Sequence, residues 1–123
     1  MEYKRLFEGS YRLMTLIWDN EPIGSTELVK LCAKELGWQK STTYTMLKKL
    51  AAKDLLKNED SVVTSLVPRE MVQRAESRLF IEQTFSGSLP DFLTAFFDGK
   101  TIGDGEAEQL YALIEAHRKE HKK

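Results

Sequence analysis

The chain is poor in cysteine, which limits the kinds of site it can build. Cys32 is the only cysteine in the 123-residue sequence, and this excludes an internal disulfide and a zinc site built from clustered thiolates. The residue falls in an apolar stripe, and no histidine or group of cations near it in the sequence would activate its thiol. We therefore expect Cys32 to be a small core residue.

Long apolar runs are also missing. Nowhere do about eighteen apolar residues follow one another, as a membrane-spanning helix requires. The N-terminal stretch MEYKRLFEGS contains no apolar run of signal-peptide length. The sequence thus predicts a soluble, cytoplasmic protein that is not inserted into a membrane.

Neither sign of charge is in large excess. The net charge is −1, which argues against a protein that coats nucleic acid without regard to sequence, because such binding needs many lysine and arginine contacts to phosphates. The positive charge is instead local. Residues 38–57 hold five lysines and one aspartate, a net +4, whereas residues 68–123 hold eight cations and ten anions, a net −2.

The sequence offers no grouping of catalytic or metal-binding residues. The acids of the C-terminal half are scattered and have no histidine, serine or cysteine arranged beside them as base and nucleophile, so we expect no enzyme and no cofactor. His117 and His121 have a spacing that can bring two imidazoles to one metal, but Glu120 is the only nearby carboxylate, and we predict no metal site. Gly103 and Gly105 follow no strand, which argues against a phosphate-binding loop.

Residues 40–53, KSTTYTMLKKLAAK, form the most informative segment, because their pattern predicts a helix with two different faces. Residues suited to a core recur at the spacing that places side chains on one side of a helix: Thr43, Met46, Leu47 and Leu50. Six polar or aromatic residues are left looking outward or to the edges of the helix: Ser41, Thr42, Tyr44, Thr45, Lys48 and Lys49. Lys40 at the start of the segment is a further candidate for DNA contact. Small hydroxyls can meet base edges while lysines reach phosphates, so we interpret the segment as a DNA-reading helix. An ordinary solvated helix has the same pattern when the segment is taken alone.

Two further helices are predicted before this segment. Residues 8–19 place Leu13, Met14, Ile17 and Trp18 on one face, and the segment 20–22 stops the helix at a proline. A second helix runs between Gly24, which can cap its start, and Gly37, which can end it. A short turn containing Gly37 and Trp38 then leads into residues 40–53, and we expect Trp38 to pack between the two helices. This order is typical of a helix-turn-helix.

A small hairpin is expected after the helix-turn-helix. Residues 55–58 can run as an extended segment, and residues 61–67, SVVTSLV, are rich in the β-branched residues that strands prefer. Glu59, Asp60 and Ser61 supply the turn between them. The sequence therefore predicts a mainly α fold with a small β-hairpin, in which residues 1–67 form a winged helix-turn-helix DNA-binding domain.

The rest of the chain, residues 68–123, is predicted to be a helical arm. Pro68 opens a helix of about seventeen residues, a break at residues 86–88 ends it, and two shorter helices follow. These helices carry strong apolar stripes but offer each other too little surface for burial, which indicates dimerisation through a second copy. The phenylalanines at positions 92, 96 and 97 fit such a dimer core, with a ligand pocket as the alternative.

In element order and in five segments the chain resembles a known family. The segments are LMTLIWD, GSTELV, TTYTMLKKL, LFIEQTFSGSL and GEAEQLYALIE, and together they resemble the BlaI/MecI/CopY family of bacterial repressors, of the penicillinase-repressor type. The resemblance implies a homodimer with winged helices on a palindromic DNA operator and intertwined C-terminal helices. It places base contacts at Ser41, Thr42 and Thr45, and backbone contacts near Tyr44 and Lys49.

The chain departs from the family pattern at three points. It lacks the paired Cys-x-Cys motifs that the resemblance associates with copper sensing. The resemblance also implies cleavage by a membrane-anchored sensor protease at an Asn-Phe bond in the arm, and the matching position here is Ala95-Phe96, without the asparagine. The wing is short and carries two acids, so we expect its contacts with DNA to reduce to Lys57 and Asn58.

These observations lead to one predicted function and one alternative. The predicted function is a sequence-specific transcriptional regulator, a homodimeric repressor that occludes a promoter by binding DNA through residues 40–53. The alternative is a winged helix that binds other proteins and makes no DNA contact, which the neutral overall charge and the acidic turn favour. Retention on a DNA resin that falls steeply with salt would distinguish the first from the second.

Overall fold

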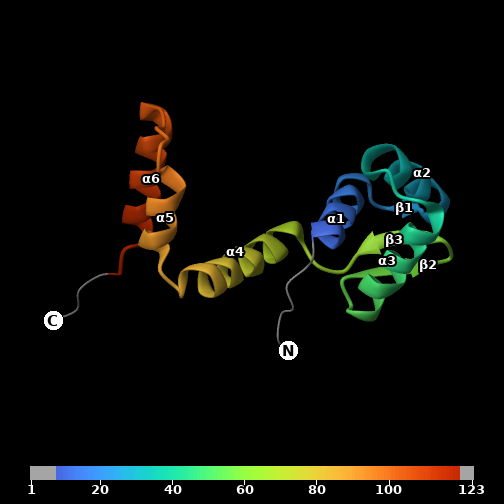
Figure 1. Cartoon of the computed structure of the whole chain (residues 1–123). Coiled ribbons are helices and arrows are strands. Elements are labelled where there is room, and N and C mark those ends of the chain that lie inside the picture. Colours follow the sequence, from blue (N-terminus) through green and yellow to red (C-terminus); the bar gives the residue numbers. More distant parts are fainter. Residues whose placement is uncertain (1–7, 120–123) are drawn as a thin grey trace.

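The computed structural model describes residues 8–119 of the chain. Over this range six helices and three short strands follow one another. The helices are α1 (Glu8–Asn20), α2 (Ser25–Leu36), α3 (Lys40–Ala52), α4 (Arg69–Phe85), α5 (Leu89–Phe97) and α6 (Asp104–His117), and the strands are β1 (Ile23–Gly24), β2 (Leu56–Glu59) and β3 (Val62–Ser65). The elements α1 to α3 gather around the sheet at one end, and α4 leads away to α5 and α6 (Figure 1).

The turn between α2 and α3 follows from one glycine. Gly37 ends α2 with a φ of 70°, a left-handed conformation that glycine adopts without steric cost. The amides of Gly37 and Trp38 turn back and donate to the carbonyls of Ala33 and Cys32, at 3.2 and 3.3 Å. This closes the end of α2 and allows α3 to begin at Lys40 in a new direction. The predicted helix-turn-helix is confirmed.

The wing is a three-stranded antiparallel sheet in the order β1-β3-β2. The hairpin of β2 and β3 was predicted. In the structure Asn58 lies opposite Val63, and Glu59 lies opposite Val62. Strand β1 was not predicted, and residues 23–24 were expected only to lead into α2. It pairs Ile23 with Val63, and two residues are too few for an alternating pattern that a sequence could reveal.

The core lies between α1, α2, α3 and the inner face of the sheet. Its fully buried apolar residues come from all of these elements and from the first turn of α4: Leu13, Met14, Ile17, Leu28, Cys32, Leu47, Leu50, Leu56, Val63 and Val72. The stripes predicted for residues 8–19 and 40–53 and the core position of Cys32 are confirmed. Val72 belongs to the helical segment expected to form the arm, yet it is 1% exposed within this core.

The arm has little core of its own. Among residues 8–119, α4 contributes the single buried residue Val72, and α5 and α6 contribute none. Edge-to-face contacts of Phe80, Phe85 and Phe92, with ring centroids 5.5 to 5.9 Å apart, join α4 to α5. No helix in the described part of the chain combines the length and the apolar character needed to span a bilayer.

Candidate nucleic-acid interface

Helix α3 has the two faces that the sequence predicts. Thr43, Leu47 and Leu50 are buried, and Met46 packs partly against the core. All seven residues of α3 that were predicted to contact DNA are exposed: Lys40, Ser41, Thr42, Tyr44, Thr45, Lys48 and Lys49. The orientation of the helix is thereby confirmed, while contact between these side chains and DNA stays a prediction.

The N-terminal end of α3 is suited to a negatively charged partner. Gln39 caps the helix in an extended conformation without a side-chain hydrogen bond, and the first turn holds no acidic residue. The amides at the start of a helix lack intrahelical acceptors and carry the positive end of the helix dipole, which favours phosphate. Lys40 and Ser41 are exposed at this end. Phosphate binding here would therefore be supported by both the backbone and a lysine.

A polar contact inside the core links α3 to α2. The hydroxyl of Thr43 is fully buried, and within the described chain no conventional hydrogen-bond partner reaches it. The thiol of Cys32 is the group it meets: burial raises the pKa of this thiol, and the interaction with Thr43 offsets the rise in part. Because a thiol is a weak hydrogen-bonding group, the Thr43 hydroxyl remains poorly satisfied. Cys32 is thus an unreactive core residue.

Trp38 joins the turn before α3 to the first turn of α1. Its side chain is partly buried and packs against the core, while its expected packing between α2 and α3 stays a prediction. A Cβ atom at Gly9 would lie 3.4 Å from Cζ2 of the indole, so the absence of a side chain at Gly9 lets α1 and the indole meet closely. This contact brings the turn before α3 next to the first turn of α1.

The wing presents its two predicted contact residues in different surroundings. Lys57 lies 3.4 Å from the carboxylate of Glu59, measured from Nζ to Oε1, because residues two apart on a strand share a face. Asn58 points to the opposite face, the one that also carries the buried Leu56. Both candidates are exposed, but the charge of Lys57 is partly compensated by Glu59 within the wing.

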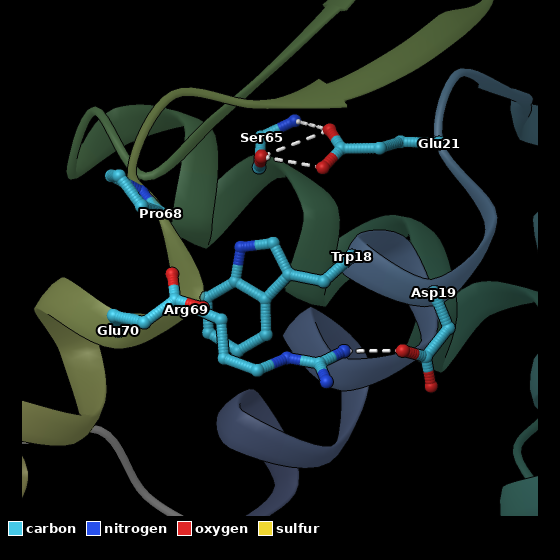
Figure 2. Close-up of a pocket in the computed structure, with 7 residues that line it drawn as sticks. All are labelled: Trp18, Asp19, Glu21, Ser65, Pro68, Arg69 and Glu70. Atoms are coloured by element: carbon cyan, nitrogen blue, oxygen red, sulfur yellow. Dashed lines mark hydrogen bonds and ion pairs between the residues drawn. The ribbon is translucent and has the colours of Figure 1, made fainter.

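A second group of polar contacts was not predicted, and it lies where α4 leaves the winged unit, which comprises the elements from α1 to β3. The indole N–H of Trp18 donates to the carbonyl of Val67 at 3.0 Å. The guanidinium of Arg69 forms an ion pair with Asp19 and lies 5.4 Å from the centre of the Trp18 ring (Figure 2). The hydrogen bond that Arg69 donates to the carboxylate of Asp19 raises the pKa of Arg69.

A second set of hydrogen bonds connects the sheet to the residue just after α1. The carboxylate of Glu21 accepts hydrogen bonds from the amide of Ser65 at 2.7 Å and from its hydroxyl at 2.9 Å (Figure 2). Asp19 and Arg69 are 50 positions apart in sequence, and Glu21 and Ser65 are 44 apart. No local pattern signals pairs at such separations.

The remaining candidate positions lie in the arm. Ala95 and Phe96 are exposed near the end of α5, and cleavage between them stays a prediction that rests on the resemblance alone. His117 places Nδ1 2.9 Å from the carbonyl of Leu113, whereas His121 and Glu120 lie outside the described residues. Among residues 8–119 no group of three or more histidines, cysteines or acids is gathered around a common point.

A helix-turn-helix with a small antiparallel wing and an outward face of hydroxyls and lysines defines the class of winged-helix DNA-binding proteins. Comparison with known proteins identifies the family. The family described as penicillinase repressor matches residues 10–116, and the chain belongs to this family of DNA-binding transcriptional repressors. Membership confirms the predicted class of function, which is not enzymatic, and decides against a winged module that makes no DNA contact.

Two relatives illustrate how far the similarity extends. The chain is 23% identical over 122 residues to the penicillinase repressor of Bacillus licheniformis, with 96% of this chain and 95% of the relative aligned. It is 28% identical over 113 residues to an uncharacterized 16.5 kDa protein in the ptsI 3' region of Latilactobacillus sakei, with 88% of this chain and 77% of the relative aligned. Both alignments cover more than four fifths of this chain.

Proposed function

We propose that the protein is a homodimeric repressor that inserts α3 of each protomer into the major groove of a palindromic operator. One observation carries this proposal: α3 buries Thr43, Leu47 and Leu50 while exposing every hydroxyl-bearing and lysine residue assigned to DNA. A helix held from behind by a core offers its outward face to a groove in a fixed orientation.

The residues of α3 fall into two groups, one that determines base preference and one that contributes affinity. Ser41, Thr42 and Thr45 carry short hydroxyls toward base edges, where they can donate and accept hydrogen bonds. The lysines of α3 and the phenol of Tyr44 contact the phosphate backbone, which contributes affinity irrespective of sequence. Since the wing adds only Asn58 and a partly compensated Lys57, α3 supplies most of the specific contact.

Exposed apolar side chains within residues 68–123 support the proposal that this arm forms the dimer. Large apolar side chains of α5 and α6 are strongly exposed in the single chain: Leu89 at 53%, Phe96 at 51%, Tyr111 at 70%, Leu113 at 57% and Ile114 at 53%. Such a run of exposed apolar residues is typical of an interface. A second copy with the same surfaces would cover them by two-fold symmetry.

The dimer would repress by occlusion. Two recognition helices placed about 34 Å apart meet successive major grooves on one side of the duplex. A dimer seated on an operator that overlaps a promoter excludes the polymerase from it. Release of the repressor by a membrane sensor protease that cuts at Ala95-Phe96 is a further proposal, and it is supported only by the resemblance and by the exposure of both side chains.

Selection from a random DNA pool tests the proposal directly. The full-length protein should enrich a palindrome, and footprinting on that sequence should protect two major-groove segments one helical turn apart. Enrichment of no sequence, or of a single half-site without symmetry, would contradict a dimeric reader of a palindrome.

The oligomeric state provides an independent test. Sedimentation equilibrium should give a dimer at micromolar concentration, and Ile114→Asp should shift it toward monomer, because a charge would be placed in an apolar interface. Gln109→Asp, at an exposed polar position of the same helix, is the matched control and should remain dimeric. A monomeric wild type would refute the arm as dimerisation unit.

A further inference from the structure

The connection between the winged unit and the arm rests mainly on the first turn of α4, and a 3.5 Å hydrogen bond from Gln73 to the hydroxyl of Tyr11 lies just beyond this turn. Val72 in the first turn of α4 is buried in the winged core, whereas Gln73 and Arg74 after it are exposed. Figure 1 shows α4 running away from the winged unit beyond this point. We call the residues that fix this turn the joint: Trp18, Asp19, Val67, Arg69 and Val72.

Three contacts restrain the joint in different directions. The hydrogen bond from Trp18 to the carbonyl of Val67 holds the chain just before α4. Val72 anchors the inner face of the first turn in the core. Arg69 holds the outer face, because its guanidinium binds the carboxylate of Asp19 and lies across the indole of Trp18 (Figure 2).

The length of α4 converts a small change at the joint into a large displacement. Its 17 residues extend about 25 Å at 1.5 Å per residue. A tilt of about 10° at the joint would therefore move the far end by about 4 Å relative to the winged unit. This exceeds the rise of about 3.4 Å between successive base pairs. The angle at the joint thus matters at the scale of a single base-pair step.

We propose that Arg69 is a positioning residue that sets which half-site spacing the dimer accepts. By bonding to Asp19 and stacking on Trp18, it fixes the angle at which α4 leaves the winged unit, and hence the distance between the two α3 helices of a dimer. This inference rests on the proposed function, because it requires dimerisation through the arm. It assigns to Arg69 no contact with DNA.

Arginine is suited to this position by its shape. A planar guanidinium can bond to a carboxylate through its edge and stack on an indole through its face, which the ammonium of lysine cannot do in the same way. The side chains of Arg69 and Asp19 are 35% and 53% exposed, and ion pairs this open to water stabilise a fold little. Loss of the pair should therefore change the angle of α4 more than the stability of the winged unit.

The test measures affinity for a series of operators that differ only in spacing. Full-length wild type, Arg69→Ala and Asp19→Asn are titrated onto the selected operator and onto versions with one or two base pairs inserted or removed at the centre. Wild type should prefer one spacing. Both variants should narrow the ratio of affinities between the preferred and altered spacings by roughly tenfold.

Matched variants separate positioning from charge. Arg74→Ala removes the same charge from an exposed arginine of the same helix and should keep the wild-type ratio. Arg69→Lys keeps the charge and should still lose part of the preference, because it cannot bond and stack together. Thermal unfolding checks that each variant remains folded.

The outcomes distinguish this inference from the proposed function. If wild type prefers one spacing and both joint variants keep that preference, Arg69 does not position the arm. If Arg69→Ala weakens binding equally at every spacing while Asp19→Asn strengthens it, Arg69 acts as a phosphate contact and the inference is overturned. If wild type is monomeric, or binds every spacing alike, the proposed dimeric reader fails together with it.

Discussion

Glu59 is expected to weaken the contact of the wing with DNA, and its replacement by glutamine should strengthen DNA binding. In the structure the carboxylate of Glu59 lies 3.4 Å from the ammonium of Lys57, with the two side chains 75% and 52% exposed. Glu59→Gln keeps the size of the side chain but removes its charge. Lys57 is then free to neutralise a phosphate, and the repulsion between Glu59 and the DNA backbone disappears.

The magnitude follows from counterion release. Each phosphate neutralised steepens the dependence of log affinity on log salt by about 0.9, so one new contact per protomer adds about 1.8 in a dimer. Between 50 and 200 mM salt, the advantage of the variant over wild type should shrink by roughly tenfold. The folding stability should change by less than about 1 kcal/mol, because pairs this exposed contribute little.

Fluorescence anisotropy across a salt series on operator DNA measures both quantities. Glu108→Gln, which makes the same charge change at an exposed position of the arm, should leave the slope as in wild type. The double variant Lys57→Gln/Glu59→Gln should lose the steeper slope. An unchanged slope for Glu59→Gln would refute the reasoning, as would a double variant that keeps the full gain.

Two further predictions concern the core behind α3. Thr43→Val should raise the free energy of unfolding by about 1 kcal/mol in urea titrations, because it removes a poorly satisfied buried hydroxyl and keeps the shape of the side chain. A lower free energy of unfolding would show that the contact of the hydroxyl with Cys32 stabilises the fold by more than its burial costs. The pKa of Cys32 is raised by burial above its ordinary value of 9.0, so above pH 9 its thiol ionises in the unfolded state first, and stability falls as pH rises. Cys32→Ala should therefore lose less stability than wild type between pH 8 and 10, and equal losses would contradict this.

The elements of the winged unit could be predicted because their signals are local. The spacing of Thr43, Leu47 and Leu50 defines the buried face of α3, and Gly37 marks the end of α2 through the left-handed conformation that it adopts. The exposed face of α3 follows from the same spacing. Such features depend on residues a few positions apart, which a sequence displays directly.

What escaped prediction depends on pairs that are distant in sequence or on partners in another chain. Strand β1 exists because Ile23 pairs with Val63, and the joint exists because Arg69 meets Asp19; neither partner is close in sequence. Val72 was assigned to the arm because periodicity tells which residues share a face but not what covers it. The same limit applies to the apolar faces of α5 and α6, which are exposed in the single chain, because their periodicity does not tell what covers them.

Replacement of Thr45 is the most direct measurement of whether α3 reads DNA. Thr45→Ala should weaken binding to the selected operator by roughly 1 to 3 kcal/mol and leave binding to random DNA nearly unchanged, whereas Lys49→Ala should weaken both and flatten the salt dependence. Titrations of both variants on both DNAs at one salt concentration, with a salt series for Lys49→Ala, make the comparison. Equal losses on operator and random DNA for Thr45→Ala would contradict the assignment of α3 as the helix that reads the sequence.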